Sequence, residues 1–274
     1  MDGLSEPSEI EVKHLFMPDR RAFVALLDEL APGDWKRPTV CAGWDVRDIA
    51  LHVLGVDLAN IAIRRDGVAY LRPAPREDFG RFIDRINGEW ITAARRLTPT
   101  LIRDLLEFTA RPLDNCMSAI DGSKIDANVS WASRQPVPGW LDLAREYMER
   151  WVHQQHIRDA VGRPGQDTPE FASPVIAASM FSLPIALEEQ PPGSLAIEIG
   201  GSGGGTWVVK SQSDGWRLFR GNLANPTARL RIAAGDWWRT VTLGLSPSDA
   251  LTKASVEGDS ALARAALDAN AIIA

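Results

Sequence analysis

The sequence has little of what would assign it to several special classes of protein. It has only two cysteines among 274 residues, Cys41 and Cys116. Two cysteines cannot build a disulfide framework, so a reducing, cytoplasmic environment is expected. No uninterrupted apolar run reaches the length of about 18 residues typical of a membrane-spanning helix. The acidic N-terminal segment has no apolar core, so no signal peptide is expected.

The chain also lacks an excess of positive charge. Lysine and arginine total 30 against 36 aspartate and glutamate residues, which leaves a formal net charge of -6. This balance predicts no surface for nucleic acid and none for an anionic membrane. Hydrophobic residues make up 45% of the chain and charged residues 24%, values that exclude a disordered polymer or a fibrous repeat.

The first part of the chain has the pattern of a helical bundle. Apolar residues recur at helical spacing in segments that turn-forming residues separate. The predicted helices cover approximately residues 18–30, 45–65, 77–97, 99–109 and 140–161, with irregular structure over 111–138. Helices of this length joined by such loops favour an antiparallel four-helix bundle. We expect it to form a domain over residues 1–165.

The pattern changes after Gly165, and residues 166–274 are expected to form a second domain. The apolar period switches to two, which predicts strands at approximately 195–199, 206–210, 215–220 and 228–232. One helix is expected after residues 234–235 and another after 258–259. Strands followed by helices indicate a small α+β domain. The glycine-rich segment 200–205 precedes a strand rather than a helix, which favours a hairpin turn over a phosphate-binding loop.

Histidine is scarce, and its placement points to metal chemistry. Only four histidines occur in the chain, and His153 and His156 share one predicted helix with Glu149. Spacings of four and three residues put all three on one helical face. His52, on a facing helix, would complete a site of two imidazoles and a carboxylate. Such a set suits zinc, with nickel, iron or manganese as alternatives, and it leaves a coordination position open.

Each of these residues also has a simpler interpretation. A histidine in an apolar helix is often a hydrogen-bonded core residue, and Glu-x-x-x-His is a common surface ion pair. Asp48, one turn before His52, is a candidate to accept its second ring N–H and fix the tautomer. Cys41 is either a redox-active thiol or a small buried side chain.

Further candidates for substrate or cofactor binding are aromatic or basic. Trp44 and Trp151 are either walls of a bundle pocket or core residues. Arg220 and Arg229, on or beside predicted strands, are either ligands for a carboxylate or solvated side chains.

Three stretches of the chain resemble the mycothiol-dependent maleylpyruvate isomerase family. Residues 34–52, DWKRPTVCAGWDVRDIALH, are similar to the family pattern W-x-x-P-T-x-C-x-G-W-x-V-x-D-x-x-x-H. Residues 138–165 resemble the family's E-x-x-x-H-x-x-D-I … G-R-P helix, with His156 where the family usually has aspartate or glutamine. The segments 204–207, 244–247 and 258–259 resemble its C-terminal domain.

The resemblance implies a DinB-like four-helix bundle followed by a sterol-carrier-like α+β domain. It puts His52, Glu149 and His153 on the family's zinc ligands, with water or the thiolate of mycothiol, the low-molecular-weight thiol of actinobacteria, in the fourth position. For His156 it leaves three roles open: a hydrogen-bonding residue behind the ligands, an extra ligand, or a surface residue.

The implied chemistry is that of a zinc-activated thiol acting on a small electrophile. A thiolate can add to a cis double bond conjugated to a carbonyl, allow rotation, and leave as the trans product forms. It can instead stay attached, as in an S-transferase. Metal-bound water would give a hydrolase. A non-catalytic module that binds an apolar ligand or a partner is the alternative from another class. The oligomeric state is not indicated by the sequence.

Overall fold

The computed structural model describes residues 3–69 and 71–272, and they fall into two compact units. The helical unit consists of Val12–Asp121 and Glu149–Gly165. The sheet unit consists of 3–11, Gly122–Met148 and Gln166–Ile272. The predicted domain boundary between residues 165 and 166 stays a prediction.

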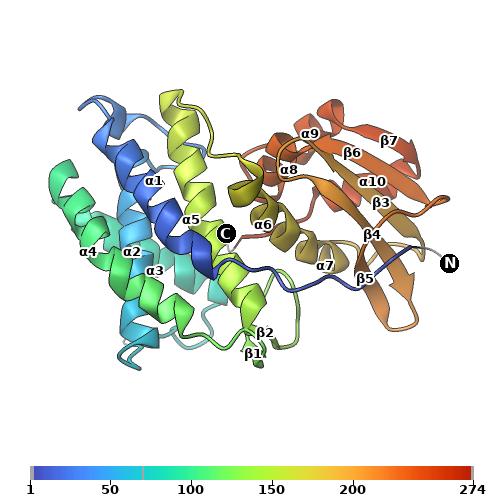
Figure 1. The fold of residues 1–274 in the computed structure, drawn as a ribbon, viewed down its shortest axis with the longest axis horizontal. Helices are drawn as coiled ribbons and strands as arrows, with labels where there is room; N and C mark the ends of the chain where they lie inside the picture. Colours follow the sequence, from blue (N-terminus) through green and yellow to red (C-terminus); the bar gives the residue numbers. More distant parts are fainter. Residues whose placement is uncertain (1–2, 70, 273–274) are drawn as a thin grey trace. The chain divides into compact units, whose positions relative to one another are not determined.

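The N-terminal half is helical, as predicted. Its helices are α1 (Phe16–Asp28), α2 (Val46–Arg64), α3 (Phe79–Ala94), α4 (Pro99–Ser118) and α5 (Gly139–Val161) (Figure 1). Helix α4 contacts α1 and α2, and α3 contacts α2. Three-residue 3-10 helices at Lys13–Leu15 (η1) and Asp34–Lys36 (η2) lie before and after α1.

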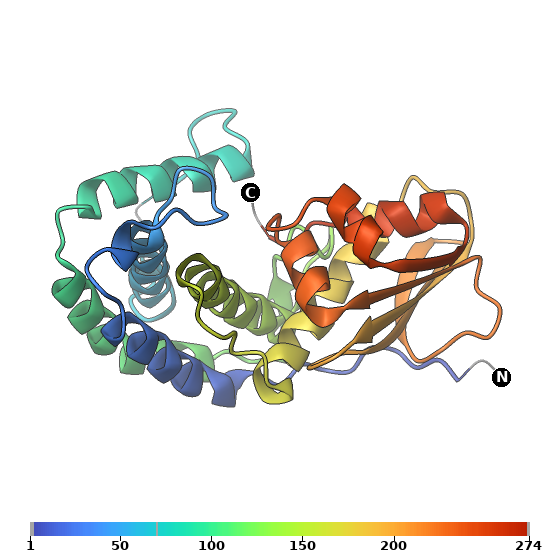
Figure 2. The ribbon, with the colours of Figure 1, turned by 90° about the horizontal axis from the view of Figure 1, so that it is seen from above.

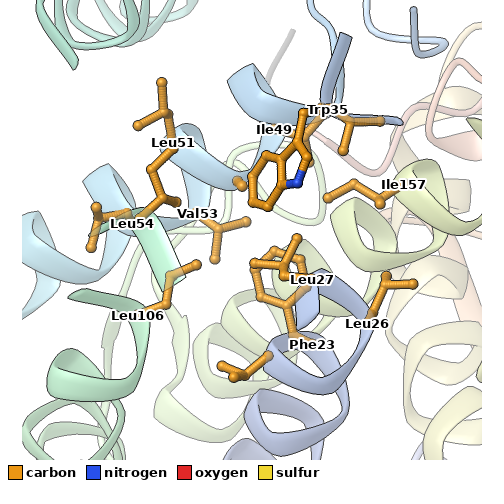
Figure 3. Close-up of a cluster of buried hydrophobic side chains, with 14 of the residues drawn as sticks. Phe23, Leu26, Leu27, Trp35, Ile49, Leu51, Val53, Leu54, Leu106 and Ile157 are labelled. Carbon is orange, nitrogen blue, oxygen red and sulfur yellow. The ribbon is translucent and has the colours of Figure 1, made fainter. Parts of the chain in front are cut away.

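The core of the helical unit draws apolar side chains from all five of these helices. Figure 3 shows Phe23 and Leu27 of α1 facing Leu106 of α4, with Ile49 of α2 and Ile157 of α5 beside them. All five are at most 3% exposed. Removing large apolar side chains from water is the dominant stabilising effect in folding, and here it fixes α2 and α5 in one core.

Each of the two helices that carry the candidate ligands has a well-formed cap, α2 at its start and α5 at its end. At the start of α2, the Asp45 carboxylate accepts a hydrogen bond from the Asp48 backbone N–H, and the Asp48 carboxylate accepts one from the Asp45 N–H. The predicted N-cap at Asp45 is therefore confirmed, as a capping box. Helix α5 ends at Val161, and the following Gly162 has a φ of 68°, in the left-handed region that glycine adopts without strain.

Helix α4 is longer than the sequence pattern predicts, because it continues through Pro112 to Ser118. Proline removes one intrahelical hydrogen bond, which usually ends a helix. The acceptor that loses its partner belongs to Phe108, whose side chain is 74% exposed, so water can reach this face of the helix. Beyond the proline, Leu113 and Met117 are buried. Their burial compensates for the lost bond. The predicted irregular segment also contains two short paired strands, β1 (Ile125–Ala127) and β2 (Val137–Pro138).

The sheet unit contains a five-stranded sheet in the order β5-β4-β3-β6-β7. Its strands are β3 (Ser194–Gly200), β4 (Gly205–Gln212), β5 (Gly215–Arg220), β6 (Ala228–Ala233) and β7 (Ser255–Gly258). Strand β3 pairs parallel with β6, and the other pairs are antiparallel. This confirms the predicted α+β character, and Figure 2 shows the sheet.

The helices of this unit are α6 (Pro169–Ser179), α7 (Leu183–Ala186), α8 (Ala234–Val241), α9 (Pro247–Lys253) and α10 (Ser260–Leu267), with a 3-10 turn, η3 (Met180–Ser182), between α6 and α7. Helices α8 and α10 contact β6. The sequence pattern predicted neither α9 nor β7, since both are short. The glycine-rich segment forms the β3–β4 hairpin turn, with Gly201 and Gly203 at positive φ, as predicted.

Across the described residues, no helix combines the length and the hydropathy that crossing a lipid bilayer requires.

Candidate metal centre

Three side chains from two helices converge on one point in the helical unit. The Nε2 atom of His52, on α2, lies 3.0 Å from Glu149 Oε1, and the Nε2 atom of His153, on α5, lies 3.1 Å from the same oxygen. The two imidazole rings are 4.6 Å apart in an edge-to-face arrangement. One donor atom from each residue lies within 4.8 Å of the other two, a spacing that suits a single metal ion.

The surroundings of these residues favour different protonation states for the two histidines. His52 is only 5% exposed, and burial, the largest influence, lowers its pKa from the ordinary 6.5 in spite of the nearby Glu149. Burial also disfavours a charged His153. Its attraction to the Glu149 charge, the nearby Cys41 thiol and the hydrogen bond to Glu149 outweigh that effect and raise the pKa of His153 to about 10.

Glu149 is held as a carboxylate. Burial by itself would raise the pKa of this group, but the charge of His153 and the hydrogen bonds with both histidines lower it well below its usual value. An ionised carboxylate between two imidazoles is a donor set of the type that binds divalent zinc.

Trp44 lies against this centre, whereas Trp151 belongs to the core. The ring of Trp44, in the loop before α2, is 5.0 Å from the His52 ring at an interplanar angle of 42°. Trp44 is half-buried. Trp151 is fully buried at 0% exposure, so a ligand has no surface of it to contact. The structure therefore corrects the interpretation of Trp151 as a pocket wall.

Asp48 does not orient the ring of His52. Its two carboxylate oxygens accept hydrogen bonds from Arg95, at the end of α3, with lengths of 2.9 and 2.7 Å. Within the described part of the chain, His52 Nδ1 has no hydrogen-bond partner. The prediction for Asp48 fails because capping the helix and pairing with Arg95 use its carboxylate.

His156 is buried, at 3% exposure, which excludes its interpretation as a surface residue. Its Nδ1 atom lies 3.4 Å from the sulfur of Cys41. Cys41, His156 and His153 form a second group whose donor atoms lie within 4.8 Å of one another. Cys41 is half-buried, and it is not joined to Cys116.

A buried ionic network that the sequence analysis missed links α2 to α5 beside the centre. Asp57, one and a half turns after His52, is 2.5 Å from Arg20 Nη2 and 3.3 Å from Arg150 Nη2. It also accepts a 2.8 Å hydrogen bond from the Thr109 hydroxyl. Arg150 directly follows Glu149 in α5. The network therefore fixes α5 at the point where the Glu149 carboxylate meets His52. The only signal in the sequence is a charged residue within each apolar helix face.

The two predicted arginine ligands belong to the sheet unit, and both have partners there. Arg229 is largely buried and donates to the Glu198 carboxylate, the Asn222 side chain and the Leu223 carbonyl. The Arg220 guanidinium lies 4.5 Å from the centre of the Trp207 ring. The hydrogen bonds of Arg229 indicate a structural role for this residue. A binding role for Arg220 stays a prediction.

The fold and the convergent side chains define a class of protein: a helical unit that presents two imidazoles and a carboxylate from two helices, together with an α+β unit. The family described as mycothiol maleylpyruvate isomerase N-terminal domain matches residues 16–158, which is more than half of the chain. The chain belongs to this family.

Solved structures show the same fold over most of the chain. A crystal structure of the mycothiol-dependent maleylpyruvate isomerase aligns with a TM-score of 0.52 and 12% identity, covering 89% of this chain and 91% of that one. A mutant of that isomerase aligns with a TM-score of 0.50 and 12% identity, covering 89% and 92%. The sterol carrier protein domain 2 of Helicoverpa armigera matches 38% of this chain and 87% of its own, at 16% identity and a TM-score of 0.26. No curated protein matches the sequence.

Proposed function

We propose that the chain is a zinc-dependent, mycothiol-using isomerase that acts on a small electrophilic substrate, with His52, Glu149 and His153 as the metal ligands. The observation that carries the proposal is the meeting of two imidazole Nε2 atoms at one oxygen of Glu149, at 3.0 and 3.1 Å. Membership of the family and the likeness in fold to the isomerase support it.

The donor set fits a divalent zinc ion. Once a metal ion displaces the His153 proton, the two imidazoles and one carboxylate are borderline ligands that zinc prefers over magnesium or calcium. Three protein ligands leave one position for an exogenous group. A zinc ion held by these three residues would lower the pKa of a thiol coordinated at that position, so that the thiol would be a nucleophile at neutral pH.

The residues around the ligands hold them in place. The Asp57–Arg150 pair fixes α5 against α2 on one side of the centre, and the Asp48–Arg95 pair anchors the first turn of α2 on the other. The Trp44 ring packs against the His52 ring. Ligands held in this way need little rearrangement when the ion binds.

The same residues can serve an S-transferase, which keeps the thiol attached to the electrophile. The two functions differ in product: an isomerase regenerates free mycothiol, and an S-transferase consumes it in equal amount. We favour the isomerase because its fold matches 89% of this chain. A cytoplasmic location, where thiols stay reduced, is part of the proposal and agrees with two cysteines that form no disulfide with each other.

Metal content and thiol-dependent turnover test the proposal together. We expect about one zinc per chain in the purified protein, and loss of most of it in His52→Ala and His153→Ala. His14→Ala, which removes an exposed histidine on η1, is the matched control and should retain the metal. Isomerisation of a cis unsaturated keto acid should require both zinc and mycothiol.

Two results would count against this proposal. Unchanged zinc in the His52 variant would reject the ligand set. Metal-dependent turnover that ignores added thiol would reject the use of mycothiol and favour a hydrolase.

A further inference from the structure

Cys41, His153 and His156 form a second donor set, of which the proposed function uses only His153. Cys41 lies in the loop between η2 and α2, and the two histidines are three residues apart on α5. The Cys41 sulfur is 3.4 Å from His156 Nδ1, and one donor atom from each of the three residues lies within 4.8 Å of the other two. All three residues belong to the helical unit, where His156 is buried and Cys41 and His153 are half-buried.

Its chemistry differs from that of the first set. One thiol and two imidazoles form a softer set than two imidazoles and a carboxylate, because a thiolate is the most polarizable ligand that a protein offers. Soft ions such as Cd²⁺ bind such a set well, and magnesium or calcium do not. Local geometry also supports the set: Thr39 Oγ1 accepts a 3.3 Å hydrogen bond from the Cys41 backbone N–H and orders the loop.

We propose that Cys41, His153 and His156 form a second binding site for a thiophilic divalent cation, and that this site shares His153 with the first. Imidazole has two ring nitrogens. The Nε2 atom of His153 faces Glu149, whereas its buried Nδ1 atom has no hydrogen-bond partner among the described residues. His153 is therefore the one residue whose loss weakens binding at both sets.

Titration of the metal-free, full-length protein with Cd²⁺ tests this site by a signal that only a thiolate gives. A bond between cadmium and a cysteine sulfur produces an ultraviolet charge-transfer band, and binding through imidazole or carboxylate does not. The wild-type chain should develop this band as one Cd²⁺ per chain is added. Cys41→Ser should lose it, and Cys116→Ser should keep it, since Cys116 is buried in α4.

Histidine variants separate this site from the proposed zinc site. His156→Ala should lower the apparent Cd²⁺ affinity measured by the band at least about tenfold and leave zinc content unchanged. His52→Ala should keep the band while losing zinc. His153→Ala should lose both. Thermal unfolding followed by circular dichroism checks that each variant is folded.

A band that survives Cys41→Ser, or one that disappears in Cys116→Ser, would overturn the site. A band that is absent from the wild-type chain would do the same, and would leave the Cys41–His156 contact as a hydrogen bond. A folded His153→Ala variant that keeps the full band would overturn the sharing of His153. None of these results depends on whether His52→Ala retains zinc, so failure of this proposal and failure of the proposed function are distinguishable.

Discussion

At the scale of single residues, buried carboxyl groups in the helical unit differ in the partners they meet. Asp57 faces two arginines, whereas Asp19 Oδ1 accepts a 3.0 Å hydrogen bond from the uncharged amide of Gln154. Burial, the largest influence, raises the pKa of Asp19, and Arg20, Arg150 and Arg158 only partly offset it. The resulting pKa is about 7, against an ordinary value of 3.8.

This shift predicts a pH-dependent contribution to stability. Between about pH 4 and about pH 7 the unfolded chain has lost the Asp19 proton and the folded chain retains it, so the free energy of unfolding falls as pH rises. Asp19→Asn removes this loss and keeps an acceptor for Gln154. Between pH 4.5 and pH 8, we expect the free energy of unfolding of the variant to rise by about 1–3 kcal/mol relative to that of the wild type. Urea unfolding at each pH measures this difference.

Asp28→Asn, an exposed carboxyl group on the same helix, is the control and should change little over this range. A stability difference between Asp19→Asn and wild type that stays constant with pH would show that Asp19 is ionised throughout.

The same scale shows where sequence reasoning succeeds at the candidate site and where it does not. His52, Glu149 and His153 were identified from helical spacing and from the family resemblance, and the structure brings them together. Asp48 was assigned to His52 because the two are one turn apart on α2. Its actual partner, Arg95, is 47 residues away in the sequence, and no local pattern indicates such a pairing.

At the scale of elements, the approach of α3 to α2 depends on one glycine. The indole of Trp90, on α3, packs over Gly55 of α2 and donates a 2.7 Å hydrogen bond to the Leu51 carbonyl. A Cβ atom on Gly55 would lie 2.6 Å from Trp90 Cδ1, closer than real contacts allow. Since the indole is a rigid ring, it would have to move away and its hydrogen bond would weaken.

We therefore expect Gly55→Ala to destabilise the protein by about 1–3 kcal/mol, although alanine is the better helix former. Gly88→Ala is the matched control, because Gly88 lies in α3 with nothing within 4 Å of its Cβ position. This change should stabilise by about 0.5–1 kcal/mol. Urea unfolding followed by circular dichroism measures both. Equal effects of the two substitutions would mean that α3 can move away from α2 without a loss of stability.

At the scale of the whole molecule, metal binding is expected to stabilise one compact unit selectively. The three proposed ligands come from α2 and α5 within the helical unit. An ion that binds only the folded state stabilises it by about 2.7 kcal/mol when its free concentration is a hundred times the dissociation constant. Saturation with zinc should therefore slow amide hydrogen exchange in α2 and in α5 after Glu149, and change strands β3–β7 little.

His52→Ala should abolish this protection, and a chelator should reverse it in wild type. Equal protection in both units would contradict the assignment of the ion to α2 and α5.

The sequence by itself determined the helical and α+β character of the two parts, the caps of α2 and α5, and three of the residues at the centre. These features depend on local chemistry: apolar periodicity, capping side chains, and spacings along one helix face. Only the tertiary structure decided that Asp48 binds Arg95, that α4 continues past Pro112, and that Cys41 meets His156. Each of these features depends on side chains that are far apart in the sequence. Only the packing of the helices brings such side chains together.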